Sequence, residues 1–198
     1  LNVKNLDCDF YVFSGHKLYG PSGVGILYMK DKWFDQFDPY QGGGSMIEDV
    51  EIDKTIYGKG FQKFEAGTPP IAQVIGLSSS IDFVLSIGFD KITKIEKELY
   101  NYAIEKLKHF NEFDIYGQNI DKGAIITFNI KNIHPSDLAL LLDQRNIAIR
   151  TGHHCAQPLM KYLGINSSAR ASFGIYNNKE DVDIFVNSIS EAKQILKN

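Results

Sequence analysis

The pattern of apolar and polar residues predicts that the chain begins with paired strands around a lysine. Residues 8–13 are aromatic and β-branched and end at Ser14 and Gly15, and residues 24–29 form a second apolar run. The turn formers Gly20, Pro21 and Gly23 lie between the two runs. Short apolar runs bounded by Gly, Pro and Ser are typical of strands. We therefore expect a hairpin-like unit with Lys17 in its connection.

From residue 72 the spacing of apolar residues becomes helical. It predicts helices over residues 72–87 and 90–110, and the second helix carries an apolar stripe opposite its charges. A smaller α+β unit is expected to follow, with strands at 114–116, 124–130, 147–150 and 169–173, helices at 136–145 and 158–163, and a final helix capped by Asn178. The chain is thus predicted to be an α/β protein, with one part over residues 1–80 and another over residues 81–198.

Composition and charge narrow the function classes. The 198 residues are 43% hydrophobic and 23% charged, with a formal net charge of -3. That balance is ordinary for a soluble globular protein and offers no basic surface for nucleic acid. No apolar run approaches the roughly 20 residues of a transmembrane helix, and the first residues lack the features of a signal peptide. Because the sequence opens as though partway through a structure, we expect a fragment of a longer protein.

A lysine follows the first predicted strand at a position that suits a Schiff-base amine. Ser14 and His16 flank it with groups able to hydrogen-bond a phosphate, and nearby glycines allow a bulky cofactor close to the backbone. An amine used in this way has to be partly desolvated and held among polar groups. The alternative is an ordinary turn lysine in solvent.

The segment from Arg150 to Cys155 places a thiol beside basic side chains. An arginine and the two histidines His153 and His154 form an electropositive setting that favours a thiolate nucleophile. A buried inert cysteine is the alternative. Zinc is disfavoured because adjacent His-His-Cys residues rarely converge on one ion. Cys8, flanked by two aspartates, is expected to be structural, and both thiols are expected to be free in a reducing cytosol.

One arginine interrupts the small and apolar residues of the predicted strand at 169–173. A guanidinium on a half-buried strand usually has a carboxylate partner. For Arg170 that partner is either a protein side chain or a ligand.

Five motifs in one order carry a family resemblance. They are SGHKLYGPSG at 14–23, GGGSM at 42–46, FEAGTP at 64–69, RTGHHC at 150–155, and RAS at 170–172 with YN at 176–177. This series resembles the SUF-type cysteine desulfurases, of the NifS-like fold-type I pyridoxal 5'-phosphate (PLP) enzymes, over essentially the whole chain. The resemblance implies the C-terminal part of a PLP-dependent transferase fold, comprising the end of the large mixed-sheet domain and a small α+β C-terminal domain.

The resemblance also implies a role for each matching residue. Lys17 would hold PLP covalently and move the substrate proton, and Ser14 and His16 would bind the cofactor phosphate. Thr68 would reach the phosphate of the neighbouring subunit. Cys155 would accept the sulfur as a persulfide. The arginines Arg170 and Arg150 would bind the substrate, Arg170 through its α-carboxylate.

The implied function is conversion of L-cysteine to L-alanine by a cytoplasmic or organellar homodimer. The sulfur would pass to an acceptor protein of the SUF system for iron–sulfur cluster assembly, and no metal site is implied in the chain itself. Two alternatives stay open, a selenocysteine lyase and a non-catalytic fragment or scaffold. By the same resemblance, a ring-stacking His, an Asp facing the pyridine nitrogen and a glycine-rich phosphate turn would precede Leu1.

Overall fold

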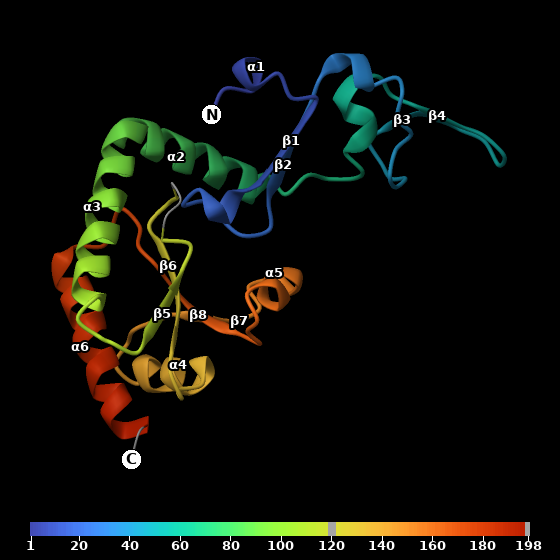
Figure 1. The fold of residues 1–198 in the computed structure, drawn as a ribbon. Coiled ribbons are helices and arrows are strands. Elements are labelled where there is room, and N and C mark those ends of the chain that lie inside the picture. Colours follow the sequence, from blue (N-terminus) through green and yellow to red (C-terminus); the bar gives the residue numbers. More distant parts are fainter. Residues whose placement is uncertain (119–121, 197–198) are drawn as a thin grey trace. The chain divides into compact units, whose positions relative to one another are not determined.

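The computed structural model describes residues 1–118 and 122–196, which belong to two compact units (Figure 1). The first unit is Leu1–Gly88 and the second is Phe89–Asn198. The predicted boundary between residues 80 and 81 falls inside helix α2 (Ile71–Ile87). The two units divide eight residues later, after Gly88, where a positive φ of 87° ends the helix.

The first unit is built from two separate antiparallel strand pairs and one long helix. Strand β1 (Phe10–Ser14) pairs with β2 (Gly25–Met29), which confirms the predicted hairpin-like unit. Strand β3 (Ile47–Val50) pairs with β4 (Thr55–Tyr57). The unit also contains the short helix α1 (Val3–Leu6), the 3-10 turns η1 (Gly15–Lys17), η2 (Asp31–Trp33) and η3 (Gly60–Phe64), and α2. The second hairpin was not predicted, because acidic residues interrupt its apolar pattern.

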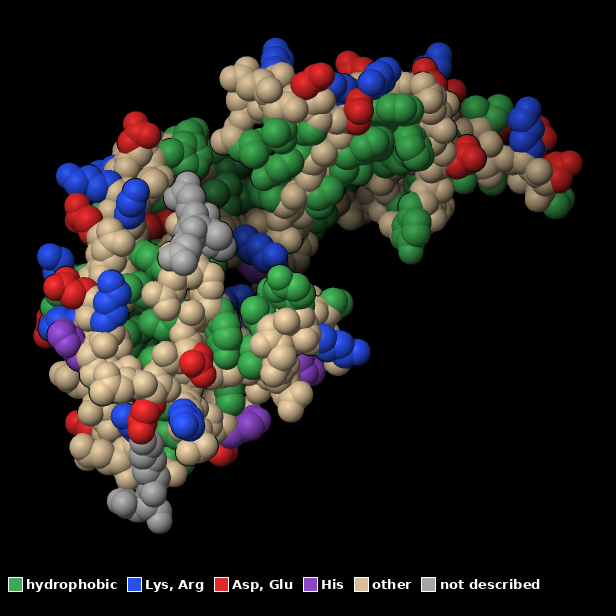
Figure 2. All heavy atoms as spheres, viewed as in Figure 1, with side chains coloured by type: hydrophobic (Ala, Val, Ile, Leu, Met, Phe, Trp, Pro, Cys, Tyr) green, Lys and Arg blue, Asp and Glu red, His purple; other side chains and the backbone are tan. Residues whose placement is uncertain are grey.

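The first unit buries few of its apolar side chains. Among its described residues only four hydrophobic side chains are buried, and many others are exposed over its strands and over α2 (Figure 2). The buried ones are Val24, Met46, Leu77 and Val84. Val12 on β1 and Ile75 on α2 are 70% and 64% exposed. Exposed apolar surface of this extent is typical of an interface with further polypeptide.

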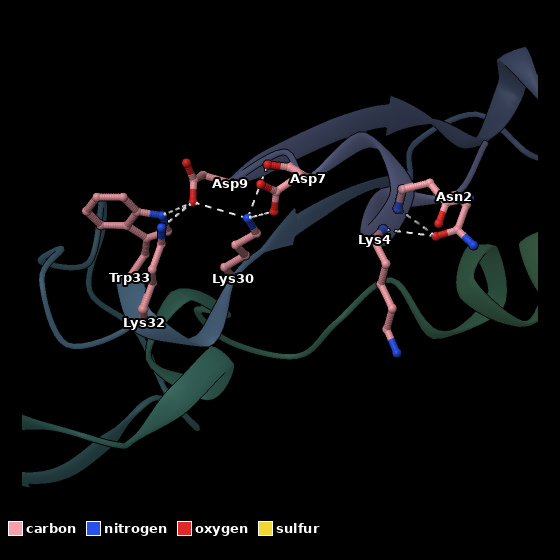
Figure 3. Close-up of polar contacts among 8 residues, drawn as sticks. Asn2, Lys4, Asp7, Asp9, Lys30, Lys32 and Trp33 are labelled. Atoms are coloured by element: carbon pink, nitrogen blue, oxygen red, sulfur yellow. Dashed lines mark hydrogen bonds and ion pairs between the residues drawn. The ribbon is translucent and has the colours of Figure 1, made fainter.

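A charge network ties the start of β1 to the end of β2 (Figure 3). The Lys30 ammonium lies 2.6 Å from an Asp7 carboxylate oxygen, and Asp9 accepts hydrogen bonds from Lys32 at 2.8 Å and from the Trp33 indole at 2.9 Å. These donors lower the pKa of both aspartates. Because these groups are exposed or only partly buried, the network orients the chain more than it stabilises it.

The second unit is a four-stranded antiparallel sheet with helices on one face. The sheet order is β5–β6–β8–β7, from β5 (Phe113–Tyr116), β6 (Ile125–Ile130), β8 (Ser168–Ser172) and β7 (Arg150–Gly152). Helices α3 (Phe89–Leu107) and α6 (Lys179–Leu196) run side by side, with α4 (Pro135–Asp143) beside α6 (Figure 1). The short helix α5 (Gln157–Tyr162) lies between β7 and β8 in the sequence.

The alternation of residues along β6 and β8 decides which face meets the helices. Ile126, Phe128 and Ile130 of β6 are buried with Ala169 and Ala171 of β8 in one core with α3, α4 and α6. The alternate positions of these strands therefore face away from that core. The predicted cap of α6 is confirmed, because the Asn178 side chain accepts a hydrogen bond from the Asp181 amide at 3.1 Å.

One predicted strand lies earlier in the sequence than the observed one. Residues 147–150 were expected to be extended in the sheet, but β7 pairs with β8 only over Arg150–Gly152. Asn146 has a positive φ of 59°, and Ile147 and Ile149 pack against the core without pairing in the sheet. The apolar alternation at residues 147–150 thus indicates contact with the core and does not indicate strand pairing.

Among the helices that the structure describes, none alone combines the length and apolar character needed to cross a bilayer.

Candidate functional site

The turn that carries Lys17 is held by backbone hydrogen bonds. Gly15 donates to the Val24 carbonyl at 2.9 Å and accepts from the Leu18 and Gly20 amides at 2.9 and 3.1 Å. A Cβ at position 15 would lie 2.8 Å from the Val24 side chain, which is closer than real Cβ contacts. Only glycine therefore fits at this position, and the turn keeps the neighbouring Lys17 side chain exposed.

Helix α2 supports the same turn from behind. The Ser80 hydroxyl donates a hydrogen bond to the Leu18 carbonyl at 2.8 Å. Gly76 lies against Pro21, where a Cβ would come within 3.2 Å of the ring. Sequence reasoning missed Ser80, because a serine within an apolar helix gives no sign of what it contacts.

The turn presents three polar side chains of the first unit, those of Ser14, His16 and Lys17. Within the described residues none of the three has a hydrogen-bond or ion-pair partner. Thr68 is exposed and lines a separate groove of about 580 Å³ whose lining includes none of those three residues. The residues that line this groove include Val24 and Gly25, and Gly25 is the strand partner of Ser14. The structure therefore places Ser14, His16 and Lys17 on one turn and places Thr68 on a groove that none of these three residues lines.

The second unit places two arginines opposite each other. Arg150 of β7 and Arg170 of β8 are direct register partners, and Thr127 of β6 is the partner of Arg170 on its other side. All three occupy the sheet face away from the helical core. The Nε atom of Arg170 is buried and has no partner among the described residues. Neither arginine has a carboxylate partner among the residues that the structure describes, and two such cations facing each other make this side of the sheet suited to an anion.

Cys155 lies next to this pair on the loop after β7. Its sulfur accepts a hydrogen bond from Nη2 of Arg150 at 3.3 Å, and the side chain is exposed. Arg150 and Cys155 line an open hollow of about 480 Å³. Of the described residues, no group of three or more His, Cys, Asp or Glu side chains is placed to hold a metal ion. Cys8 is a free, half-buried thiol in the first unit.

His154 does not supply the positive charge that the sequence suggested. Burial lowers the pKa of its imidazole, and the nearby Arg170 guanidinium lowers it further, as do Arg150 and His153. The backbone hydrogen bond with Ser168 acts in the opposite direction. Arg150 is therefore the cation that contacts the sulfur, and the surroundings of His154 favour its neutral form.

This lowered pKa predicts a pH-dependent stability of the second unit. The unfolded imidazole has a pKa of about 6.5, so between that value and the lower folded pKa the unfolded chain binds a proton that the folded chain does not. The contribution of His154 is fully present above about pH 6.5 and is lost as pH falls through the folded pKa.

Urea unfolding followed by circular dichroism from about pH 7.5 to pH 5 checks this prediction. The fluorescence of Trp33, the single tryptophan, reports the first unit separately. The difference in unfolding free energy between the native chain and His154→Gln should shrink as pH falls. A difference that stays constant over this range would contradict the assignment.

Comparison with known proteins decides the family. The model of the aminotransferase class-V family matches residues 1–185, which is nearly the whole chain. The chain belongs to the class-V aminotransferase family. Both the lysine turn and the cysteine loop lie within the matched residues of this family member.

The class-V chain is similar to curated and solved cysteine desulfurases. It is 47% identical over 195 residues to a probable cysteine desulfurase of Staphylococcus epidermidis, covering 98% of this chain and 47% of that protein. The cysteine desulfurase CsdA from Escherichia coli matches with a TM-score of 0.92 and 38% identity, over 98% of this chain and 48% of that one. A cysteine desulfurase from Thermococcus onnurineus matches with a TM-score of 0.91 and 41% identity, over 96% and 48%.

These matches confirm the predicted α/β fold and the NifS-like resemblance. The chain spans about half the length of the curated relatives it matches. The roles of individual residues stay predictions.

Proposed function

We propose that this chain is the lysine- and cysteine-bearing half of a PLP-dependent cysteine desulfurase. The assembled protein would convert L-cysteine to L-alanine and hold the released sulfur as a persulfide on Cys155. The observation that carries this proposal is the hydrogen bond from Arg150 to the exposed Cys155 sulfur, next to a partly buried Arg170 whose buried Nε atom has no partner in the described part of the chain. The similarity to cysteine desulfurases supports it.

The lysine turn fits PLP by the chemistry of its donors. Ser14 and His16 can hydrogen-bond a phosphate, and Lys17 offers the amine that would hold the cofactor covalently. When bound, PLP supplies an electron sink for breaking bonds at the substrate α-carbon. The freed Lys17 amine would take the α-proton of the substrate and later return a proton. Thr68 is proposed to contact the phosphate across a homodimer.

The arginine pair would bind and orient the substrate. Arg170 can grip the α-carboxylate of L-cysteine through two parallel hydrogen bonds. A carboxylate there would also reduce the repulsion between the two positive charges of Arg150 and Arg170, which face each other across the strand pair. Arg150 would then be shared between the substrate pocket and the Cys155 sulfur.

The sulfur step uses the thiolate of Cys155 as nucleophile. The thiolate attacks the sulfur of the bound substrate and forms a sulfur–sulfur bond. The carbon–sulfur bond of the substrate breaks, and its electron pair stays with the substrate carbon, which is protonated to give alanine. The product persulfide on Cys155 would pass its outer sulfur to an acceptor protein of the SUF system for iron–sulfur cluster assembly.

Persulfide detection on a defined peptide tests the proposal. Two preparations are made. One is the chain alone, and the other is the chain co-expressed with the part of the Staphylococcus epidermidis relative that lies outside the match. After PLP and L-cysteine are added, mass spectrometry should find one extra sulfur atom on the Cys155 peptide, and alanine should accumulate. Cys155→Ser should abolish both signals, and Cys8→Ser should leave both intact.

The alternatives give different results in the same assay. Alanine formed from L-selenocysteine at an unchanged rate in Cys155→Ser, with none formed from L-cysteine by the native chain, would favour a selenocysteine lyase. No alanine from either amino acid in the co-expressed preparation would overturn the enzyme proposal and favour a scaffold.

A further inference from the structure

The loop that carries Cys155 has a backbone conformation that its residues do not favour. His154 and Cys155 both have positive φ, at 54° and 58°, and Gly152 precedes them at 111°. A left-handed conformation is unfavourable for a residue that carries a Cβ atom. Two such residues in succession persist only where the surrounding structure holds them.

The His154 ring connects this loop to the sheet. Its Nε2 atom lies 3.0 Å from the Ser168 carbonyl oxygen and 3.0 Å from the Ser168 hydroxyl. Since a carbonyl oxygen only accepts, Nε2 carries the hydrogen. Ser168 is fully buried and is the register partner of Gly152, so the ring reaches from the loop to the strand that pairs with the loop's own beginning.

The far side of the loop is anchored at the same strand residue. The Ala156 amide donates to the His153 carbonyl at 2.8 Å and closes the turn around Cys155. Met160 of α5 is buried, and its sulfur lies 3.9 Å from the Ser168 hydroxyl, which donates to it. Contacts to Ser168 thus flank Cys155 on both sides in the sequence.

The surroundings of the ring select the neutral form with its hydrogen on Nε2. Its Nδ1 atom is buried and has no partner among the described residues. The charged and titratable groups around it are Arg170 on β8, Arg150 on β7 and His153 on the same loop, and all of them disfavour a second proton. One tautomer is therefore available for the hydrogen bond to Ser168.

We propose that His154 is a positioning residue whose Nε2–H bond to the Ser168 carbonyl holds Cys155 in the left-handed conformation that places its sulfur against Arg150. Its catalytic meaning rests on the proposed function, because the sulfur held in this way is the proposed acceptor. The geometric claim stands without turnover and can be tested on the chain itself.

Two amide substitutions separate hydrogen bonding from backbone strain. His154→Gln places an N–H at about the reach of Nε2 and keeps the strain of an ordinary side chain at positive φ. His154→Asn is one bond too short to reach Ser168, yet asparagine tolerates positive φ better than most residues. The proposal expects Gln to preserve the position of the sulfur and Asn to lose it, whereas an effect of strain alone would give the opposite order.

The readout is the coupling between positions 154 and 150, measured through alkylation of Cys155 at one fixed pH. All variants carry Cys8→Ser, so that iodoacetamide reports one thiol. Replacing Arg150 by Gln should change the alkylation rate when residue 154 is His or Gln. With Asn at 154 the Arg150 substitution should have no further effect on the alkylation rate. The effect of Arg150→Gln with His at 154 should therefore exceed its effect with Asn at 154 by about threefold or more.

Equal sensitivity of the alkylation rate to Arg150→Gln in the His154→Asn variant, or loss of that sensitivity in the His154→Gln variant, would overturn the proposal. Circular dichroism of each variant shows whether the second unit stays folded. If Asn unfolds it, the Gln variant still decides, because the sensitivity to Arg150 has to survive there. Coupling without any persulfide in the desulfurase assay would leave the positioning role intact and contradict only the proposed function.

Discussion

Replacing Lys17 with alanine is expected to abolish covalent binding of the cofactor and to stop desulfurase turnover. Lys17 lies on a turn that the backbone hydrogen bonds of Gly15 and the Ser80 hydroxyl hold in place, so its amine is positioned with Ser14 and His16. Loss of a positioned acid–base group alone typically lowers a rate by about 10²–10⁴-fold. Borohydride reduction followed by mass spectrometry should find the pyridoxyl group on the Lys17 peptide of the native chain and on no peptide of the variant.

Lys59→Ala is the matched control in the same unit. Lys59 is also an exposed lysine, at the start of η3. It should leave the cofactor adduct and alanine formation at native levels. An adduct that remains in Lys17→Ala, or that appears on another lysine of the native protein, would contradict the assignment of the cofactor lysine.

Replacing Arg170 with methionine is expected to weaken the enzyme and stabilise the second unit at the same time. Truncating one partner of a buried charge pair typically costs about 2–5 kcal/mol, so kcat/KM for L-cysteine should fall at least about 30-fold. Without substrate, the substitution removes a cation that directly opposes Arg150, and like charges in opposed positions destabilise a sheet by about 0.2–1 kcal/mol. Urea unfolding and steady-state kinetics measure the two effects on the same protein.

Arg145→Met is the control for this prediction. Arg145 is also partly buried, but it forms an ion pair with Glu191 at 2.7 Å. Its replacement should leave kcat/KM unchanged and should not increase stability. A loss of stability in Arg170→Met would mean that Arg170 is held by a protein partner, and its assignment to the substrate carboxylate would then be wrong.

The cysteine loop shows that a sequence motif does not specify the charge and direction of each side chain in it. The run from Arg150 to Cys155 indicated three cationic neighbours for the thiol. In the structure Arg150 contacts the sulfur, while His154 turns to Ser168, and burial and Arg170 lower the pKa of its imidazole. Adjacency in sequence does not specify the direction of a side chain, and burial depends on strands that arrive from elsewhere in the chain.

The sequence by itself determined the elements whose signals are local. The apolar stripes of α3 and α6, the Asn178 cap and the hairpin around Lys17 each depend on residues within a few positions of one another, so periodicity and turn chemistry predict them. Only the tertiary structure decided that Arg150 opposes Arg170, that Ser80 supports the lysine turn and that His154 reaches Ser168. These contacts join segments distant in sequence, and their geometry is set by strand register and core packing, which no local pattern encodes.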